Sequence, residues 1–191
     1  FYRLNKSTQF FVGLSATGYA FPGTILAIGI LHFLAQIEST AQLFILGFIP
    51  YSNEVIVSGT IFVLIIAYLT RFNAVGFGSV TAGLEQIPRE LMSASQLLGR
   101  RFSGSVWSIM IPNLWPSILA GGLLLFVDIM KELPLTLLLR PLNFDTFSTI
   151  TYQLAKDEML EQAAYPALCI VLSGLIPVII ANKALSKIAR K

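Results

Sequence analysis

The sequence predicts an all-α fold, namely a bundle of helices that crosses a membrane several times. Hydrophobic residues make up 55% of the 191-residue chain and charged residues only 12%, whereas soluble domains carry about 25% charged residues. The mean hydropathy is +0.75. The apolar residues are gathered in runs of roughly 20, which is the length of helix that crosses a bilayer.

Four such runs are candidate transmembrane helices. They cover residues 16–35, 55–72, 114–130 and 162–182. An alternative is that these runs are the buried core helices of a soluble protein, but little sequence remains to form a solvated surface. The single cysteine, Cys169, lies within the fourth run, so the chain has neither an internal disulfide nor a thiolate zinc cluster.

The distribution of lysine and arginine predicts which side of the membrane each connection faces. Ten of these residues lie in the N-terminal segment, between the second and third runs, or in the C-terminal tail, and three lie between the third and fourth runs. Because cytoplasmic connections are enriched in these residues, both ends and the middle connection should be cytoplasmic. The ten are Arg3, Lys6, Arg71, Arg89, Arg100, Arg101, Lys183, Lys187, Arg190 and Lys191, and the three are Lys131, Arg140 and Lys156.

A polar and basic stretch, SASQLLGRRFSGSVWSIMIP (93–112), lies in this middle connection. Pro88 suits the first turn of a helix, where its missing N–H has no partner to lose. A helix that starts there should end at Gly99, because glycine adopts the left-handed conformation of a C-terminal cap.

A second short helix is expected over 102–111, and Pro112 and Pro116 should bracket a turn into the third run. The resulting helix–glycine–helix segment has two interpretations. It could rest on the lipid headgroups as an amphipathic helix, or it could contact another protein. The small side chains at 93–95 favour the protein contact, because they let another surface approach closely.

The spacing of this stretch resembles the cytoplasmic motif in the membrane subunits of binding-protein-dependent ABC importers. That motif reads Glu-Ala-Ala, three residues, Gly, nine residues, Ile, any residue, Leu, Pro. The matching positions of this chain are Ser93, Ala94, Ser95, Gly99, Ile109, Ile111 and Pro112. Ser93 replaces the acid, Ser95 replaces the second alanine, and Ile111 replaces the leucine, so an ionic contact of the family's glutamate has no equivalent here.

The resemblance implies a type I ABC importer permease fold, with a coupling helix in a cytoplasmic loop at about 79–112. In the family, this helix sits in a groove of a separate ATPase dimer, and we count Arg100 among its residues. The chain contains no G-x-x-x-x-G-K-[ST] phosphate-binding loop. We therefore expect ATP to be used by the partner subunit, with no cofactor and no catalytic residue in this chain.

Two further stretches resemble the iron(III) branch of the family. They are GYAFPGTILAIGIL (18–31) and DIMKELPLTLLLRPLNFDTFST (128–149). The resemblance implies that a substrate-binding protein delivers iron(III) and that a second permease half, fused or separate, completes the pathway in the lipid bilayer. Because the chain starts at Phe1 and this branch often fuses two halves, we expect 1–191 to be an N-terminally truncated permease domain, the C-terminal half of a fused permease.

Charged residues at the end of the third run are candidates for the lining or gate of a translocation pathway, because ionisable groups in a membrane span are costly. The alternative is an ion pair that secures the helix end at the interface. Pro134 should then interrupt the helix, and the segment after it could re-enter the bilayer. The candidate gate residues are Asp128, Lys131, Glu132, Pro134 and Thr136.

The connection between the third and fourth runs also carries an acidic group, Asp145, Asp157, Glu158 and Glu161. Such residues could bind a hard cation, but docking of the substrate-binding protein is the preferred interpretation, and no metal site is predicted.

Two alternatives remain for the function. The first is an importer of the same fold for a polyamine, thiamine, sulfate or phosphonate. The second is a membrane enzyme or scaffold with four spans, but this class predicts paired catalytic groups within the spans, and the chain contains one histidine, His32. Neither composition nor motifs indicate binding of nucleic acid.

Overall fold

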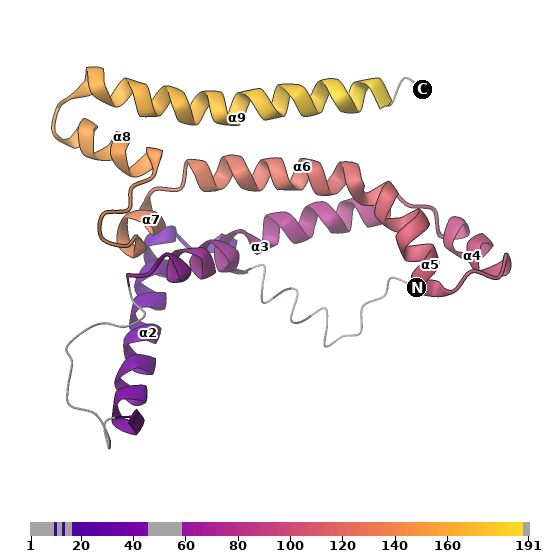
Figure 1. Cartoon of the computed structure of the whole chain (residues 1–191), viewed down its shortest axis with the longest axis horizontal. Helices are drawn as coiled ribbons and strands as arrows, with labels where there is room; N and C mark the ends of the chain where they lie inside the picture. The colour runs from indigo at the N-terminus through magenta and orange to yellow at the C-terminus, as the bar shows by residue number, and fades with distance from the viewer. Residues whose placement is uncertain (1–9, 11–12, 14–16, 46–58, 189–191) are drawn as a thin grey trace. The chain divides into compact units, whose positions relative to one another are not determined.

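The computed structural model describes Phe10, Gly13, 17–45 and 59–188, and within these residues the fold is entirely helical (Figure 1). Among the described residues, four helices are long and apolar enough to cross a membrane, in the segments Gly23–Thr40, Ile61–Glu85, Phe102–Met130 and Leu160–Ile179. The predicted class of an all-α bundle with four spans is therefore confirmed. The elements are α2 (Gly23–Ile45), α3 (Ile61–Glu85), α4 (Arg89–Leu97), α5 (Phe102–Ser105), η1 (Val106–Met110), α6 (Ile111–Met130), α7 (Pro134–Leu139), α8 (Phe147–Lys156) and α9 (Leu160–Ile188).

The first long helix starts later than the apolar run predicts. Residues 17–20 are helical, but the chain bends at Phe21, and α2 begins only at Gly23. Pro22 lies at this interruption, where it lacks the N–H that a continuous helix needs. Its carbonyl accepts the N–H of Leu26 at 3.1 Å and so starts the new helix.

The third span is also longer than predicted, because α5, η1 and α6 form one continuous helix from Phe102 to Met130. The predicted turn at Pro112 and Pro116 is wrong, since both prolines lie within this helix. The five residues of η1 adopt the wider π-helical winding directly before Pro112. This widening accommodates a proline that can neither donate a hydrogen bond nor approach the preceding turn closely. The side chain of Asn113 donates to the carbonyl of Ile109 at 2.7 Å.

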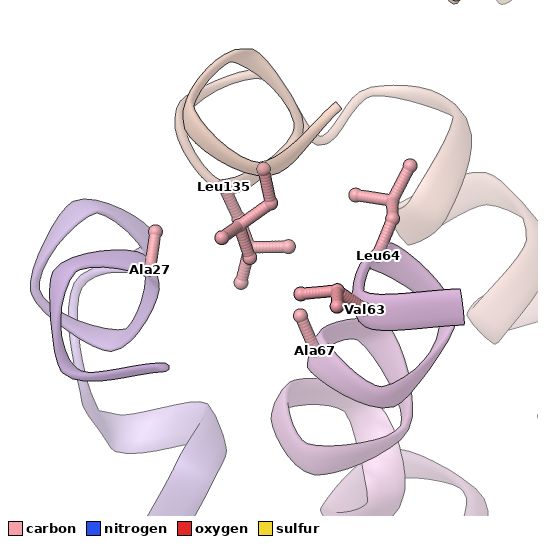
Figure 2. Packing of buried hydrophobic residues seen from close by; sticks show 6 residues of the cluster. Ala27, Val63, Leu64, Ala67 and Leu135 are labelled. Atoms are coloured by element: carbon pink, nitrogen blue, oxygen red, sulfur yellow. The ribbon is translucent and has the colours of Figure 1, made fainter. Parts of the chain in front are cut away.

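The described residues divide into two compact units, the first within the ranges 1–73 and 129–170 and the second within 74–128 and 171–191. The core of the first unit lies between α2, α3 and the short helix α7 (Figure 2). Leu135 of α7 is fully buried there, between Ala27 of α2 and Ala67 of α3. The fully or almost fully buried apolar members of this core are Ala27, Val63, Leu64, Ala67, Leu135 and Leu139.

In the second unit, α3 and α6 approach each other through small residues. A Cβ added to Gly121 of α6 would lie 2.5 Å from the Cβ of Ser79 on α3, and one added to Gly83 of α3 would lie 2.5 Å from the Cβ of Ser117 on α6. Each helix therefore contributes a serine and a glycine four residues apart, and each glycine faces a serine of the other helix. Small residues at such crossings let membrane helices pack closely.

Candidate functional site: a helical hairpin and a buried ion pair

The segment that resembles the coupling motif forms a short helix, a tight turn and a second helix. α4 ends in a Schellman motif, in which Arg100 N–H donates to Ser95 O at 3.2 Å and Gly99 N–H to Gln96 O at 2.9 Å. Gly99 has φ +82°, so the predicted left-handed cap is confirmed. The connection between α3 and the long third helix comprises 86–101, so the expected loop of 79–112 includes the last turns of α3 and the first turns of the third helix.

Two serines hold the two arms of this hairpin together. Ser95 of α4 and Ser105 of α5 are 4% and 0% exposed, and their Oγ atoms are 2.6 Å apart. Ser105 is also within 3.4 Å of the carbonyl of Arg101. A buried hydroxyl without a partner is costly, so the serine in place of the motif's second alanine is accommodated by the serine that it faces.

A second polar contact lies beside the first. Arg100, directly after the turn, donates from Nη1 to the Oγ of Ser108, and Ser108 in turn donates to the carbonyl of Gly104 at 2.8 Å. The Arg100 side chain thus lies against the second arm of the hairpin. Together with the serine pair, this contact fixes the direction in which α4 projects.

The hairpin exposes several large apolar side chains. Leu97 and Leu98, at the end of α4, are 88% and 86% exposed. Leu91, Phe102 and Trp107 are also exposed. Exposed apolar side chains on a polar and basic segment fit either of the two interpretations, namely contact with another protein or with the lipid headgroups.

The remaining motif residues occupy different positions on the hairpin. Ser93 and Ala94 are exposed on α4, whereas Ile109 and Ile111 are partly buried and Pro112 is exposed on the third helix. The structure therefore brings Ser95, Gly99 and Arg100 together at the turn. Ala94 remains exposed to solvent on α4.

A buried ion pair lies in the first unit, where α6 gives way to α7. Arg71 Nε of α3 is 3.3 Å from Glu132 Oε2, and both side chains are largely covered. The same carboxylate accepts the N–H of Leu135 through Oε1 at 3.2 Å, at the positive N-terminal end of α7. Arg71 also donates from Nη1 to the carbonyl of Phe21 at 2.9 Å, directly before α2.

The backbone carbonyl of Glu132 accepts two further hydrogen bonds. They come from the hydroxyls of Thr136 at 2.8 Å and Ser148 at 3.0 Å. Tyr68 Oη is 2.5 Å from Thr136 Oγ1. Because the single Thr136 proton is donated to Glu132, Tyr68 is the donor to Thr136. Glu132 therefore connects α3, α7 and α8.

Among the predicted gate residues, the structure buries Glu132 and Thr136 and leaves Lys131 and Pro134 exposed. Asp128 is half-buried on α6. The two interpretations of these charges are a pathway gate and an ion pair at the helix end. Glu132 does form an ion pair at the end of α6, but its partner, Arg71, lies on α3. Pro134 begins α7, so the predicted interruption of the helix is confirmed.

Sequence reasoning missed Arg71 as the partner of Glu132. It placed Arg71 in a basic connection after the second run, and this placement is wrong because α3 continues to Glu85. The available signal was the apolar sequence that follows Arg71, which continues the helical run. A charged residue with apolar sequence on both sides requires a buried partner.

The acidic residues of the connection between α7 and α9 do not form a cluster. Asp145 pairs with Arg140 and lies 3.2 Å from the hydroxyl of Thr149. Within the residues that the structure describes, no group of three or more histidine, cysteine or acidic residues could hold a metal ion.

Four helices within the described residues are long and apolar enough to cross a bilayer, which is typical of a multi-pass membrane protein. A family model described as the binding-protein-dependent transport system inner membrane component matches the chain over residues 1–191. The chain belongs to this family. It is similar to the Fe(3+)-transport system permease protein FbpB 2 of Haemophilus influenzae, with 29% identity over 165 residues. The match covers 86% of this chain, and the chain spans 29% of the length of that relative.

Proposed function

We propose that the chain forms part of the translocation pathway of an ATP-driven importer and that its substrate is iron(III). The hairpin of α4 and α5 carries the proposal, because it is ordered by its own hydrogen bonds and yet exposes Leu97 and Leu98. Such a surface is suited to a partner that covers the leucines. The partner in this proposal is an ATPase, which the binding-protein-dependent transport family implies.

In this proposal, α4 transmits motion from the ATPase to the membrane helices. The Schellman turn and the contacts of Ser95 and Arg100 make the hairpin stiff enough to push on the third helix. The close packing of α3 and α6 through Gly83 and Gly121 carries that motion into the membrane. A second permease half completes the pathway, and both ends of the chain face the cytoplasm, as does the connection that contains α4.

The proposal of iron(III) as substrate rests on the similarity to the Haemophilus influenzae permease, whose name specifies Fe(3+) transport. A substrate-binding protein delivers the ion, as the family description implies.

The test is uptake by the full-length permease, assembled with its ATPase and its binding protein in proteoliposomes. We expect ATP-dependent accumulation of radioactive iron(III) that requires the binding protein. Excess polyamine, thiamine, sulfate or phosphonate should leave the iron uptake unchanged. ATP-dependent uptake of one of these compounds, without uptake of iron, would support the importer function and refute iron(III) as its substrate. The absence of any ATP-dependent uptake would contradict the importer itself.

A further inference from the structure

The Arg71–Glu132 ion pair is assembled in a way that adds little stability. Arg71 Nε lies 3.3 Å from Glu132 Oε2 but makes no aligned hydrogen bond, while Nη1 donates to the carbonyl of Phe21. The pair therefore lacks the parallel two-bond geometry that makes arginine–carboxylate contacts strong. The desolvation of two buried charges offsets much of their attraction. Stability alone does not explain why charged groups lie at this point of apolar helices.

The position of the pair indicates what it does instead. Glu132 lies in the break between α6 and α7, where the backbone leaves the helix within apolar sequence. Backbone groups that are buried outside a regular helix need hydrogen-bond partners from the protein. Glu132 provides this through its side chain, which accepts the Leu135 N–H, and through its carbonyl, which accepts from Thr136 and Ser148. Arg71 then ties the break to α3.

The start of α2 is fitted to the same pair. A Cβ on Gly23 would lie 2.7 Å from Glu132 Oε1 and 3.0 Å from Arg71 Nη1. Both distances are shorter than ordinary contacts, so a larger residue at position 23 must displace the charged groups. The absence of a side chain at Gly23 thus leaves the space in which Arg71 reaches both Glu132 and the Phe21 carbonyl.

We propose that the Arg71–Glu132 pair is a positioning latch of the transport cycle, which holds the α6–α7 break in one register against α3 and the start of α2. Transport depends on this register, and the stability of the fold does not depend on the pair. Arg71, Glu132 and Gly23 act as positioning residues, without contact to the substrate. The inference rests on the proposed transport function.

The first test compares two substitutions of the same kind on the same helix. Gly23→Ala places a methyl group against the ion pair, whereas Gly29→Ala places one where the structure has nothing within 4 Å. Both variants are made in the full-length permease with its ATPase and binding protein, and binding-protein-dependent uptake of radioactive iron(III) is measured per folded permease. We expect Gly29→Ala to transport like the wild type and Gly23→Ala to lose about fivefold or more, the lower range of typical coupling effects.

The second test removes the charges while the fold is kept. Arg71→Met combined with Glu132→Gln neutralises the pair and keeps an acceptor for the Leu135 N–H. We expect this double variant to unfold close to the wild-type temperature, to continue hydrolysing ATP, and to lose about fivefold or more of its uptake. Arg71→Met alone should unfold at a lower temperature, because it leaves a buried carboxylate without its counter-ion.

The outcomes separate the latch from the proposed function. Wild-type uptake in Gly23→Ala, or in a stably folded neutral double variant, would overturn the latch while leaving the importer intact. If the double variant does not fold, the comparison of Gly23→Ala with Gly29→Ala decides. A wild-type permease without ATP-dependent iron(III) uptake would refute the proposed substrate instead.

Discussion

Ser95 and Ser105 form a buried hydroxyl pair, with 2.6 Å between their Oγ atoms, that joins the two arms of the α4–α5 hairpin. They are ten positions apart in the sequence, and the Schellman turn at Gly99 brings them together. Gly99, with its positive φ, turns the chain, and the serine contact then holds α4 against α5. The two features together set the direction in which the exposed Leu97 and Leu98 of the hairpin project.

The two serines should differ in the effect of their removal. Ser105→Ala leaves the Ser95 hydroxyl buried without this partner, which should lower the free energy of unfolding by about 1–3 kcal/mol. Ser95→Ala should lower it less, because Ser105 keeps the Arg101 carbonyl within reach. Replacing both should cost less than the sum of the single changes. Thermal unfolding of the purified permease and its variants measures this cycle, and strict additivity would show that the hydroxyls do not interact.

The backbone at Gly99 makes a second prediction. Gly99→Ala should destabilise the hairpin by about 1 kcal/mol, because φ +82° is unfavourable for alanine. The space around the residue is open, so crowding plays no part. Gly99→Asn should recover much of the loss, since asparagine tolerates this conformation.

The functional consequence of Gly99 is measured by transport. Gly99→Val should reduce the amount of substrate moved per ATP hydrolysed, while the protein still inserts into the membrane. Gly104→Ala is the matched control, because Gly104 lies in α5 with open space around it and without positive φ. Equal transport by Gly99→Val and the wild type would argue against a coupling role of the turn.

The crossing of α3 and α6 makes a third prediction, for which neighbouring glycines provide the comparison. Gly121→Ala forces a methyl group against Ser79, at 2.5 Å from its Cβ, whereas the space beside Gly122 is open. We expect Gly121→Ala to lower stability by about 1–3 kcal/mol and Gly122→Ala to have little effect. Adding Ser79→Gly to Gly121→Ala should restore part of the stability. Thermal unfolding in detergent measures all three, and equal effects at 121 and 122 would contradict the close crossing.

Several features were predictable because their causes are local in the sequence. The four long helices follow from apolar length, and the cap at Gly99 follows from a glycine at the end of an amphipathic run. The interruption at Pro134 follows from proline chemistry. Each of these depends on residues within a few turns of one another.

The missed features depend on contacts that are distant in sequence or on a rarer helical winding. Arg71 and Glu132 are brought together only by the packing of α7 against α2 and α3, so the sequence alone left each without a partner. The helix continues through Pro112 and Pro116 because η1 has a wider winding directly before the first proline. A π-helical turn has no residue pattern from which we could predict it. Ser105 is not a position of the motif. Its role as the hydrogen-bond partner of Ser95 is visible only in the folded structure.

Docking of α4 on an ATPase is the central claim, and cysteine cross-linking tests it most directly. Ala94, exposed on α4, is replaced by cysteine in the full-length permease after the exposed Cys169 is changed to serine. A control permease carries the cysteine at Leu142, which is 95% exposed between α7 and α8. We predict that position 94 cross-links to the co-expressed ATPase in an ATP-sensitive manner and that position 142 does not. No cross-link from position 94, with its cysteine protected by lipid instead, would contradict the coupling role and identify α4 as a helix that rests on the membrane surface.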